Sequence, residues 1–221
     1  GYRNIAIFGV DSRSDDYGVG NRSDCIIIAS INNDTGAIKL ISVYRDTYVN
    51  IEGHGLDKIT HAYSFGEAPL AIKTLNTNLD LNINEFVTVN FDSVAEAVDQ
   101  LGGVQLTITA DEIKYINGYI DETSRVTGKT SAHITQPGTY TRVRYTAGGD
   151  YKRTERMRTV IEAMFSKLKT KSITEINSFA DKILPHVYTN ISATDILTMV
   201  PSMSKYKVTE SIGWPYDTKG K

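Results

Sequence analysis

The sequence predicts an α/β domain in which a central mixed β-sheet is flanked by helices on both faces. Short runs rich in β-branched residues alternate with helical stripes of apolar residues, the pattern expected of a sheet covered by helices. The chain has 221 residues, of which 40% are hydrophobic and 23% are charged, and a chain of this kind can form one sizeable core. We therefore expect residues 1–221 to form a single domain.

Five apolar runs predict the strands of the sheet. They are IAIFGV at 5–10, CIIIAS at 25–30, AIKLISV at 37–43, FVTVNF at 86–91 and VQLTIT at 104–109. The first two runs are apolar almost throughout, as expected of central strands that are covered on both faces, whereas the third and the last alternate more. The sheet is therefore expected to lie between two layers of helices.

Helices are expected between and after these runs. Two apolar stripes with helical spacing consist of Ala68, Ala71, Ile72, Leu75 and Leu79, and of Val94, Ala95, Val98 and Leu101. The clearest helix spans 150–168, where apolar residues keep the 3.6-residue period, and another is expected at about 193–200 with Ser192 as its N-cap. Residues 111–140 are polar and predict a long loop, and 170–221 would extend the same domain.

Composition excludes some classes of function. The formal net charge of −2 gives no overall attraction for nucleic acid, which usually requires a basic domain or stripe. The lone Cys25 lies in an apolar run and is expected to be a small buried side chain. No run reaches the roughly 18 apolar residues that span a bilayer, and early charges argue against a signal peptide. The chain as given is expected to be soluble, and it is compatible with the outer part of an anchored protein.

Four clusters combine arginine with aspartate near the ends of predicted elements. They are GVDSR at 9–13, NRSD at 21–24, SVYRD at 42–46, and RVRY with GGDYKRTER within 142–156. Carboxylates and guanidinium groups in one place are typical of a site where Mg²⁺ and arginines together bind phosphate. The alternative is a set of surface ion pairs.

Asp11 and Asp24 are the candidate metal ligands. Asp11 follows the run at 5–10 at its carboxyl end, where open α/β sheets bind their ligands, and Asp24 directly precedes the run at 25–30. Sheet topology is therefore expected to bring the two carboxylates together. Turn formation or helix capping is the alternative role for both residues.

Arginines supply the candidate anion site. Arg142 and Arg144 are two residues apart in an extended stretch, so both side chains project from one face. They form either a phosphate clamp or the charges of an edge strand. Arg153 lies one turn before the apolar stripe of the helix at 150–168, with Arg156 beside it. Basic residues in a first helical turn oppose the helix dipole, which is explained if an anion binds there.

Several motifs in a fixed order resemble the LytR-CpsA-Psr family of cell-wall glycopolymer phosphotransferases. They are NIAIFGVDSR, the RSD of 22–24, SVYRDTYV at 42–49, DKITHAYSFG at 57–66, VDQLGGV at 98–104 and RVRYTAGGDYKRTERMRTVI at 142–161. Because they extend over most of the chain from 4 to about 165, the resemblance is far more specific than any single motif.

The resemblance implies an extracytoplasmic enzyme with an apolar tunnel for a polyprenyl chain, held at the cell membrane by one N-terminal helix outside this sequence. Asp11 and Asp24 would hold Mg²⁺ (or Mn²⁺) against the lipid pyrophosphate. The pyrophosphate would be bound by Arg22, Arg45, Arg142 and Arg144, and the pocket would be lined by Arg13, Arg153 and Arg156. Lys58 is a further candidate that could reach a phosphate, and the alternative is a lysine that is simply solvated in a loop.

The expected reaction is attack by a sugar hydroxyl of peptidoglycan on the phosphorus next to a teichoic acid or capsule-type glycopolymer, with polyprenyl phosphate leaving. Asp11 or Asp46 is the candidate acceptor of the hydroxyl proton. Asp46 also fits the orienting of the adjacent Arg45 guanidinium, the role that we favour. Two alternatives remain: a pyrophosphatase that uses water as the acceptor, and a lipid-carrier binding protein without turnover.

Two positions depart from the family pattern. Met157 stands where family members usually carry Gln, which removes a polar contact near the phosphates. Residues 134–144 read ITQPGTYTRVR where LxGxQALxY is usual. Neither departure removes a predicted charged ligand, so we expect activity to be retained.

Overall fold

The computed structural model of the chain describes residues 1–12, 16–117 and 149–216. Its strands are β1 (Tyr2–Val10), β2 (Ser23–Asn32), β3 (Ala37–Val43), β4 (Tyr48–Ile51), β5 (Gly55–Lys58), β6 (Glu85–Val89), β7 (Tyr188–Thr189) and β8 (Lys207–Trp214). Its helices are α1 (Thr60–Leu79), α2 (Phe91–Gln100), α5 (Gly149–Leu168), α6 (Ile173–Ile183) and α7 (Ala193–Met199), with the short 3₁₀ turns η2 (Leu184–His186) and η3 (Val200–Ser202). Residues 110–117 are also helical.

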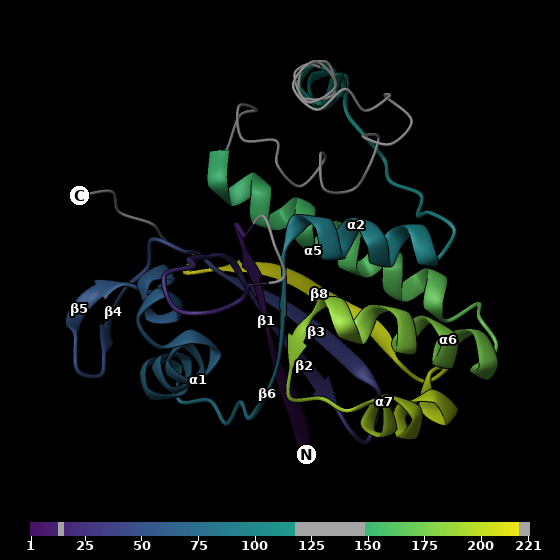
Figure 1. Cartoon of the computed structure of the whole chain (residues 1–221), viewed down its shortest axis with the longest axis horizontal. Coiled ribbons are helices and arrows are strands. Elements are labelled where there is room, and N and C mark those ends of the chain that lie inside the picture. Colours follow the sequence, from purple (N-terminus) through teal and green to yellow (C-terminus); the bar gives the residue numbers. More distant parts are fainter. Residues whose placement is uncertain (13–15, 118–148, 217–221) are drawn as a thin grey trace.

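Among the described residues, the main sheet has six strands in the order β7-β6-β1-β2-β3-β8 (Figure 1). β1 pairs antiparallel with β2 and parallel with β6. β3 pairs antiparallel with β2 and parallel with β8. The strands β4 and β5 form a separate hairpin. The mixed sheet that the sequence predicts is therefore confirmed.

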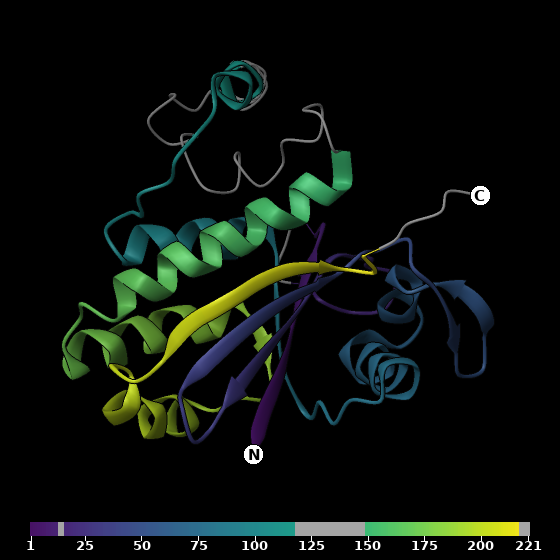
Figure 2. The ribbon, with the colours of Figure 1, turned by 180° about the vertical axis from the view of Figure 1, so that it is seen from behind.

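Helices cover both faces of this sheet, as predicted (Figure 1, Figure 2). On one face, Phe8 of β1 and Ile26 of β2 belong to a buried cluster with Leu75 of α1. On the other face, Ile27 of β2 belongs to a cluster with Met157 of α5. Because β1 and β2 present apolar side chains to both clusters, their sequences are apolar almost without interruption.

Four of the predicted strands and four of the predicted helices are present, and one predicted strand is wrong. Residues 104–109 pair with no strand among the described residues. Their apolar alternation has a different cause, because Val104 and Leu106 pack against a cluster that contains Val98 of α2 and Val160 of α5. Val104 and Leu106 are thus half-buried against helices rather than within a sheet, whereas Ile108 is exposed. The predicted strand at 86–91 ends early, because Asn90 caps α2.

Other elements carry weaker sequence signals. The edge strand β8 alternates exposed and half-buried positions and contains few large apolar residues. Neither β8 nor the helix α6 is predicted from the sequence. The helix α6 nevertheless begins with a capping box, in which the side chains of Ser172 and Glu175 each accept a hydrogen bond from the other residue's backbone N–H. The same arrangement of Ser192 and Asp195 opens α7, as the sequence predicts. Capping residues therefore mark both helices more clearly than apolar periodicity does.

The helix α1 is interrupted at Gly66 and Glu67, whose backbone angles are not helical. Glu67 has φ of 56° and ψ of −155°, a region that residues with a side chain seldom occupy. Just before this interruption, the Ser64 carbonyl accepts a hydrogen bond of 3.0 Å from the backbone N–H of Gly20. The loop that joins β1 to β2 is thereby attached to α1.

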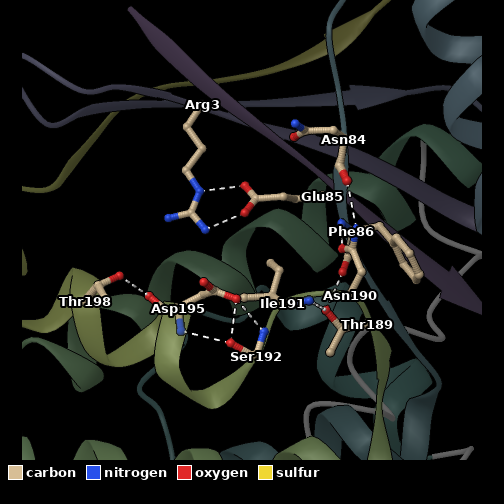
Figure 3. Close-up of polar contacts among 10 residues, drawn as sticks. All are labelled: Arg3, Asn84, Glu85, Phe86, Thr189, Asn190, Ile191, Ser192, Asp195 and Thr198. Atoms are coloured by element: carbon tan, nitrogen blue, oxygen red, sulfur yellow. Dashed lines mark hydrogen bonds and ion pairs between the residues drawn. The ribbon is translucent and has the colours of Figure 1, made fainter.

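A set of polar contacts ties the chain after α6 to the starts of β1 and β6 (Figure 3). The Arg3 guanidinium donates two hydrogen bonds to the Glu85 carboxylate, at 2.6 and 2.7 Å, and this pairing raises the pKa of Arg3. The Asn190 side chain accepts from the Phe86 backbone N–H and donates to the Asn84 carbonyl. These contacts hold the segment between β7 and α7 against β6.

The Arg3 to Glu85 pair is expected to contribute measurably to stability, because both side chains are only 24% exposed and the contact is bidentate. Arg3→Leu should lower the free energy of unfolding by about 1–2 kcal/mol in urea denaturation followed by circular dichroism. The matched control is Lys39→Leu, which breaks a pair with Glu210 whose side chains are 50% and 38% exposed and should change the free energy of unfolding much less. Equal losses in the two variants would contradict this interpretation.

Candidate active site

Asp24 lies at the centre of the charged residues that the sequence singles out. It is the second residue of β2 and is 8% exposed. One carboxylate oxygen accepts a hydrogen bond of 2.6 Å from Nη1 of Arg45, and the other accepts one of 3.3 Å from Nη1 of Arg153. Nη2 of Arg153 also donates to the backbone carbonyl of Asp24, at 2.9 Å. Two guanidinium groups from distant parts of the chain therefore converge on one carboxylate.

A local irregularity in the sheet puts Asp24 in this position. Gly9 pairs with Cys25 and Val10 pairs with Ser23, so Asp24 is an extra residue opposite β1. In regular pairing neighbouring side chains point to opposite faces, but a bulge re-aims one of them. Asp24 and Cys25 accordingly line the same pocket.

The two arginines of α5 are buried, as their place on the apolar stripe predicts: Arg153 is 4% exposed and Arg156 is 3% exposed. Nε of Arg156 donates to the Glu112 carboxylate at 2.7 Å, and the backbone N–H and hydroxyl of Thr109 donate to the same carboxylate. Burial alone would raise the pKa of Glu112, but these hydrogen bonds outweigh it and hold the pKa below its usual value. Arg156 therefore fixes the stretch at 109–112 beside α5.

Asp46 lies beside Arg45 and Lys58 rather than facing the pocket. Its carboxylate is 2.7 Å from Nζ of Lys58 and 3.7 Å from Nε of Arg45. Partial burial alone would raise the pKa of Asp46, but Lys58 and Arg45 lower it overall. A carboxylate held in its ionised form by two cations is a weak proton acceptor. The contacts of Asp46 therefore favour a role in orienting Arg45.

The remaining predicted residues are less closely placed. Asp11 is exposed just after β1, and Arg22 is exposed just before β2. Because Val10 pairs with Ser23, both residues lie at the same end of the sheet as Asp24. The predicted ligands Arg13, Arg142 and Arg144 lie outside the described residues.

A mostly apolar pocket adjoins the Asp24 and Arg153 pair. Its cavity is only about 20 Å³, room for little more than one water molecule. Its lining consists of Gly9, Val10, Asp24, Cys25, Val89, Asn90, Phe91, Arg153 and Met157. Burial raises the pKa of the Cys25 thiol to about 12, so this thiol stays protonated and apolar. The site is therefore a narrow apolar cleft beside the arginines.

Sequence reasoning missed a third buried arginine of α5. Arg158 is 6% exposed and donates to the hydroxyls of Ser42 in β3 and Ser211 in β8. Burial lowers the pKa of its guanidinium, and no carboxylate of a described residue lies within ion-pair distance. Its signal in the sequence was its position three residues before Ile161 and seven before Phe165, which pack against the cluster on this face of the sheet.

Comparison with known proteins identifies the family. The model of the LytR_cpsA_psr family matches residues 1–215. The chain belongs to this family. It is 33% identical over 195 residues to a polyisoprenyl-teichoic acid–peptidoglycan teichoic acid transferase, TagU, of Enterococcus faecalis, covering 87% of this chain and 62% of that protein.

Two further similarities support this membership. The teichoic acid transferase TagT of Bacillus subtilis is 30% identical over 233 residues, covering 98% of this chain and 69% of that protein. The solved structure of TagT bound to LIIa-WTA superposes with a TM-score of 0.75 at 26% identity, covering 100% of this chain and 82% of that one. The chain thus spans 62% of the TagU and 69% of the TagT sequence lengths.

The described residues contain neither a membrane-spanning helix nor a cluster of metal-binding side chains. In residues 1–12, 16–117 and 149–216, no helix combines the length and the apolar character needed to cross a bilayer. Over the same ranges, no three His, Cys, Asp or Glu side chains gather closely enough to hold a metal ion.

Asp24→Ala should destabilise the protein strongly, because it leaves Arg153 buried without its carboxylate partner. We expect the free energy of unfolding to fall by about 3–5 kcal/mol, measured by urea denaturation. Asp46→Ala is the control, since the Asp46 side chain is 49% exposed and its loss should cost less than about 1 kcal/mol. If Asp24→Ala cost no more than the control, the arginines would not depend on Asp24 for their charge balance.

Glu112 should make stability sensitive to acid. Because its folded-state pKa is below the unfolded value of 4.5, its ionised form stabilises the fold above about pH 4.5, and this contribution is lost as pH falls through the folded pKa. The stability difference between the wild type and Glu112→Gln should therefore shrink between about pH 6 and pH 3. A difference that stays constant over this range would contradict the assignment.

Proposed function

We propose that this chain transfers a polyprenyl-pyrophosphate-linked anionic glycopolymer to peptidoglycan. The convergence of Arg45 and Arg153 on Asp24, at the edge of an apolar pocket, carries the proposal. Such a site suits a ligand with a long apolar chain and a pyrophosphate head. Membership of the LytR_cpsA_psr family and the activity for which the TagU and TagT relatives are named support the choice of substrate class.

In the proposed reaction, a peptidoglycan hydroxyl oxygen forms a bond to the phosphorus next to the glycopolymer. The bond from that phosphorus to the bridging oxygen breaks, and polyprenyl phosphate leaves with the electron pair. Arg45 and Arg153 would share their N–H donors between Asp24 and the phosphate oxygens as charge develops there. Arg22 and Lys58 are both exposed. Their positive charges would attract the anionic substrate.

The carboxylates Asp11 and Asp24 would hold Mg²⁺ (or Mn²⁺) together with substrate phosphates. Oxygen donors of this kind suit Mg²⁺, which is usually bound by one or two carboxylates plus phosphates and water. The pairing of Val10 with Ser23 places both carboxylates at one end of the sheet, so the donor set fits. When bound, the ion would neutralise part of the pyrophosphate charge.

Asp11 and Asp46 are the candidates for accepting the hydroxyl proton. Lys58 and Arg45 lower the pKa of Asp46, which weakens it as a base, and a Mg²⁺ ion held by Asp11 would weaken Asp11 in the same way. Because the acceptor is cell-wall peptidoglycan, we place the domain on the outer face of the cell membrane, with an N-terminal helix outside this sequence as its single anchor. A pyrophosphatase and a lipid-carrier binding protein are the competing functions.

The test is transfer of a radiolabelled disaccharide from polyprenyl pyrophosphate to peptidoglycan oligomers with Mg²⁺. The wild type should form the conjugate, and Arg45→Ala and Asp11→Ala should each reduce its rate at least about 100-fold. Removal of Mg²⁺ with a chelator should also abolish conjugate formation. Lys39→Ala is the control, because Lys39 pairs with Glu210 at the far end of β3 and its rate should stay at the wild-type value.

The products separate the three functions. Conjugate that depends on Arg45 and Asp11 supports the transferase. Free glycan phosphate without conjugate would replace it with the pyrophosphatase. Tight binding of the lipid with no Mg²⁺-dependent product would leave only the carrier-binding role.

A further inference from the structure

A second pocket lies beside the loop that joins β1 to β2, and it shares no residue with the pocket at Asp24. Its lining consists of Tyr17, Gly18, Glu67, Pro185, Val187 and Tyr188. It encloses about 640 Å³ including its wide mouth. The lining comes from three separate parts of the chain: the β1 to β2 loop, the interruption in α1, and the segment around η2 and β7.

Hydrogen bonds and ring contacts fix these three parts in place. The Tyr17 hydroxyl donates to the His186 carbonyl at 2.5 Å, and the Tyr63 hydroxyl donates to the Tyr17 carbonyl at 3.0 Å. The Tyr188 ring packs edge-on against Phe86, with 5.0 Å between the ring centres. A pocket whose walls are already fixed loses little entropy when it binds a ligand.

The chemistry of the lining favours a neutral sugar over an anion. It contains one carboxylate, two tyrosines and two apolar residues, and none of its residues is Lys, Arg or His. A pyrophosphate or a teichoic acid phosphate would meet only the negative charge of Glu67. A sugar can instead donate hydroxyl hydrogens to that carboxylate and place its C–H face against an aromatic ring such as Tyr188, which is 36% exposed.

Glu67 gives independent support for a ligand. Its φ of 56° with ψ of −155° favours glycine and is strained for a residue with a side chain. Its carboxylate has no hydrogen bond or ion pair with another side chain in the described ranges, so no internal contact offsets this strain. Oε1 lies 3.8 Å from the position that a Cβ on Gly18 would take, which places the carboxylate at the pocket wall. A strained residue that presents a free carboxylate to a pocket is typical of a binding position.

We propose that this second pocket binds a neutral amino-sugar residue of the acceptor glycan. The inference rests on the proposed transferase function, and it assigns the acceptor, rather than the anionic donor, to this pocket. The position fits, because the pocket wall at Tyr17 and Gly18 belongs to the loop between Asp11 and Arg22. A glycan strand seated here is held beside the end of the sheet where the donor pyrophosphate would lie.

Binding of chitotetraose, an uncharged chain of N-acetylglucosamine, tests the site by calorimetry. Glu67→Gln and Tyr188→Ala should each weaken its binding about tenfold, while binding of octaprenyl pyrophosphate stays unchanged. The control is Tyr2→Ala, which removes another exposed tyrosine from the opposite end of β1 and should leave both affinities at the wild-type value. Wild-type affinity for chitotetraose in both pocket variants, or no binding by the wild type, overturns the proposal.

Glu67→Gly provides a second test that does not depend on a weakened fold. Glycine adopts the φ of this position without strain, so the melting temperature should rise by about 2–4 °C while chitotetraose binding falls about tenfold. A rise in melting temperature without a loss of binding would overturn the proposal. Transfer activity without chitotetraose binding would support the transferase function and overturn only this sugar site. Chitotetraose binding without any transfer would support the sugar site and overturn the transferase function.

Discussion

The placement of Asp24 between two arginines depends on one extra residue at the start of β2. Cys25 faces the α5 side of the sheet, so in regular pairing Asp24 would face α1 instead. The bulge opposite Gly9 and Val10 turns Asp24 toward the same pocket as Cys25. There it meets Arg153 of α5 and Arg45, which follows β3. A shift of one residue in the backbone thus decides whether the three charges form one site.

The helix α5 carries three buried guanidinium groups, of which Arg153 and Arg158 contact the sheet, and each has a different partner. Arg153 contacts Asp24, Arg156 contacts Glu112, and Arg158 contacts two serine hydroxyls. Ionic partners balance the first two charges, whereas hydroxyls only solvate the third. Burial of such a charge is costly, but it leaves this side of the helix with a net positive potential. An anion that enters between α5 and the sheet is stabilised by that potential.

Much of this site could be predicted from the sequence, because residue type and local position carry the information. Asp24 and Arg45 stand at the ends of strands, and Arg153 continues an apolar stripe, so each could be selected without a structure. The bulge could not be predicted, since nothing in the run from Ser23 to Cys25 distinguishes an irregular strand start from a regular one. The wrong strand at 104–109 shows the same limit: alternation reveals which side chains are buried, but not whether a sheet or a pair of helices buries them.

The neighbours of Met157 in the fold indicate its role as part of an apolar pocket wall. In the sequence it appears only as the loss of a polar group near the phosphates. In the fold it is 7% exposed and forms the pocket wall with Cys25 and Gly9, where a Cβ on Gly9 would come within 3.0 Å of the Cys25 Cβ. These three residues make the wall next to the Asp24 and Arg153 pair apolar. Because a charged phosphate would lose its hydration there without gaining a polar contact, only the apolar part of a ligand can lie against this wall. In the proposed function, this wall would orient the lipid, with its apolar chain toward Met157 and Cys25 and its pyrophosphate toward the arginines.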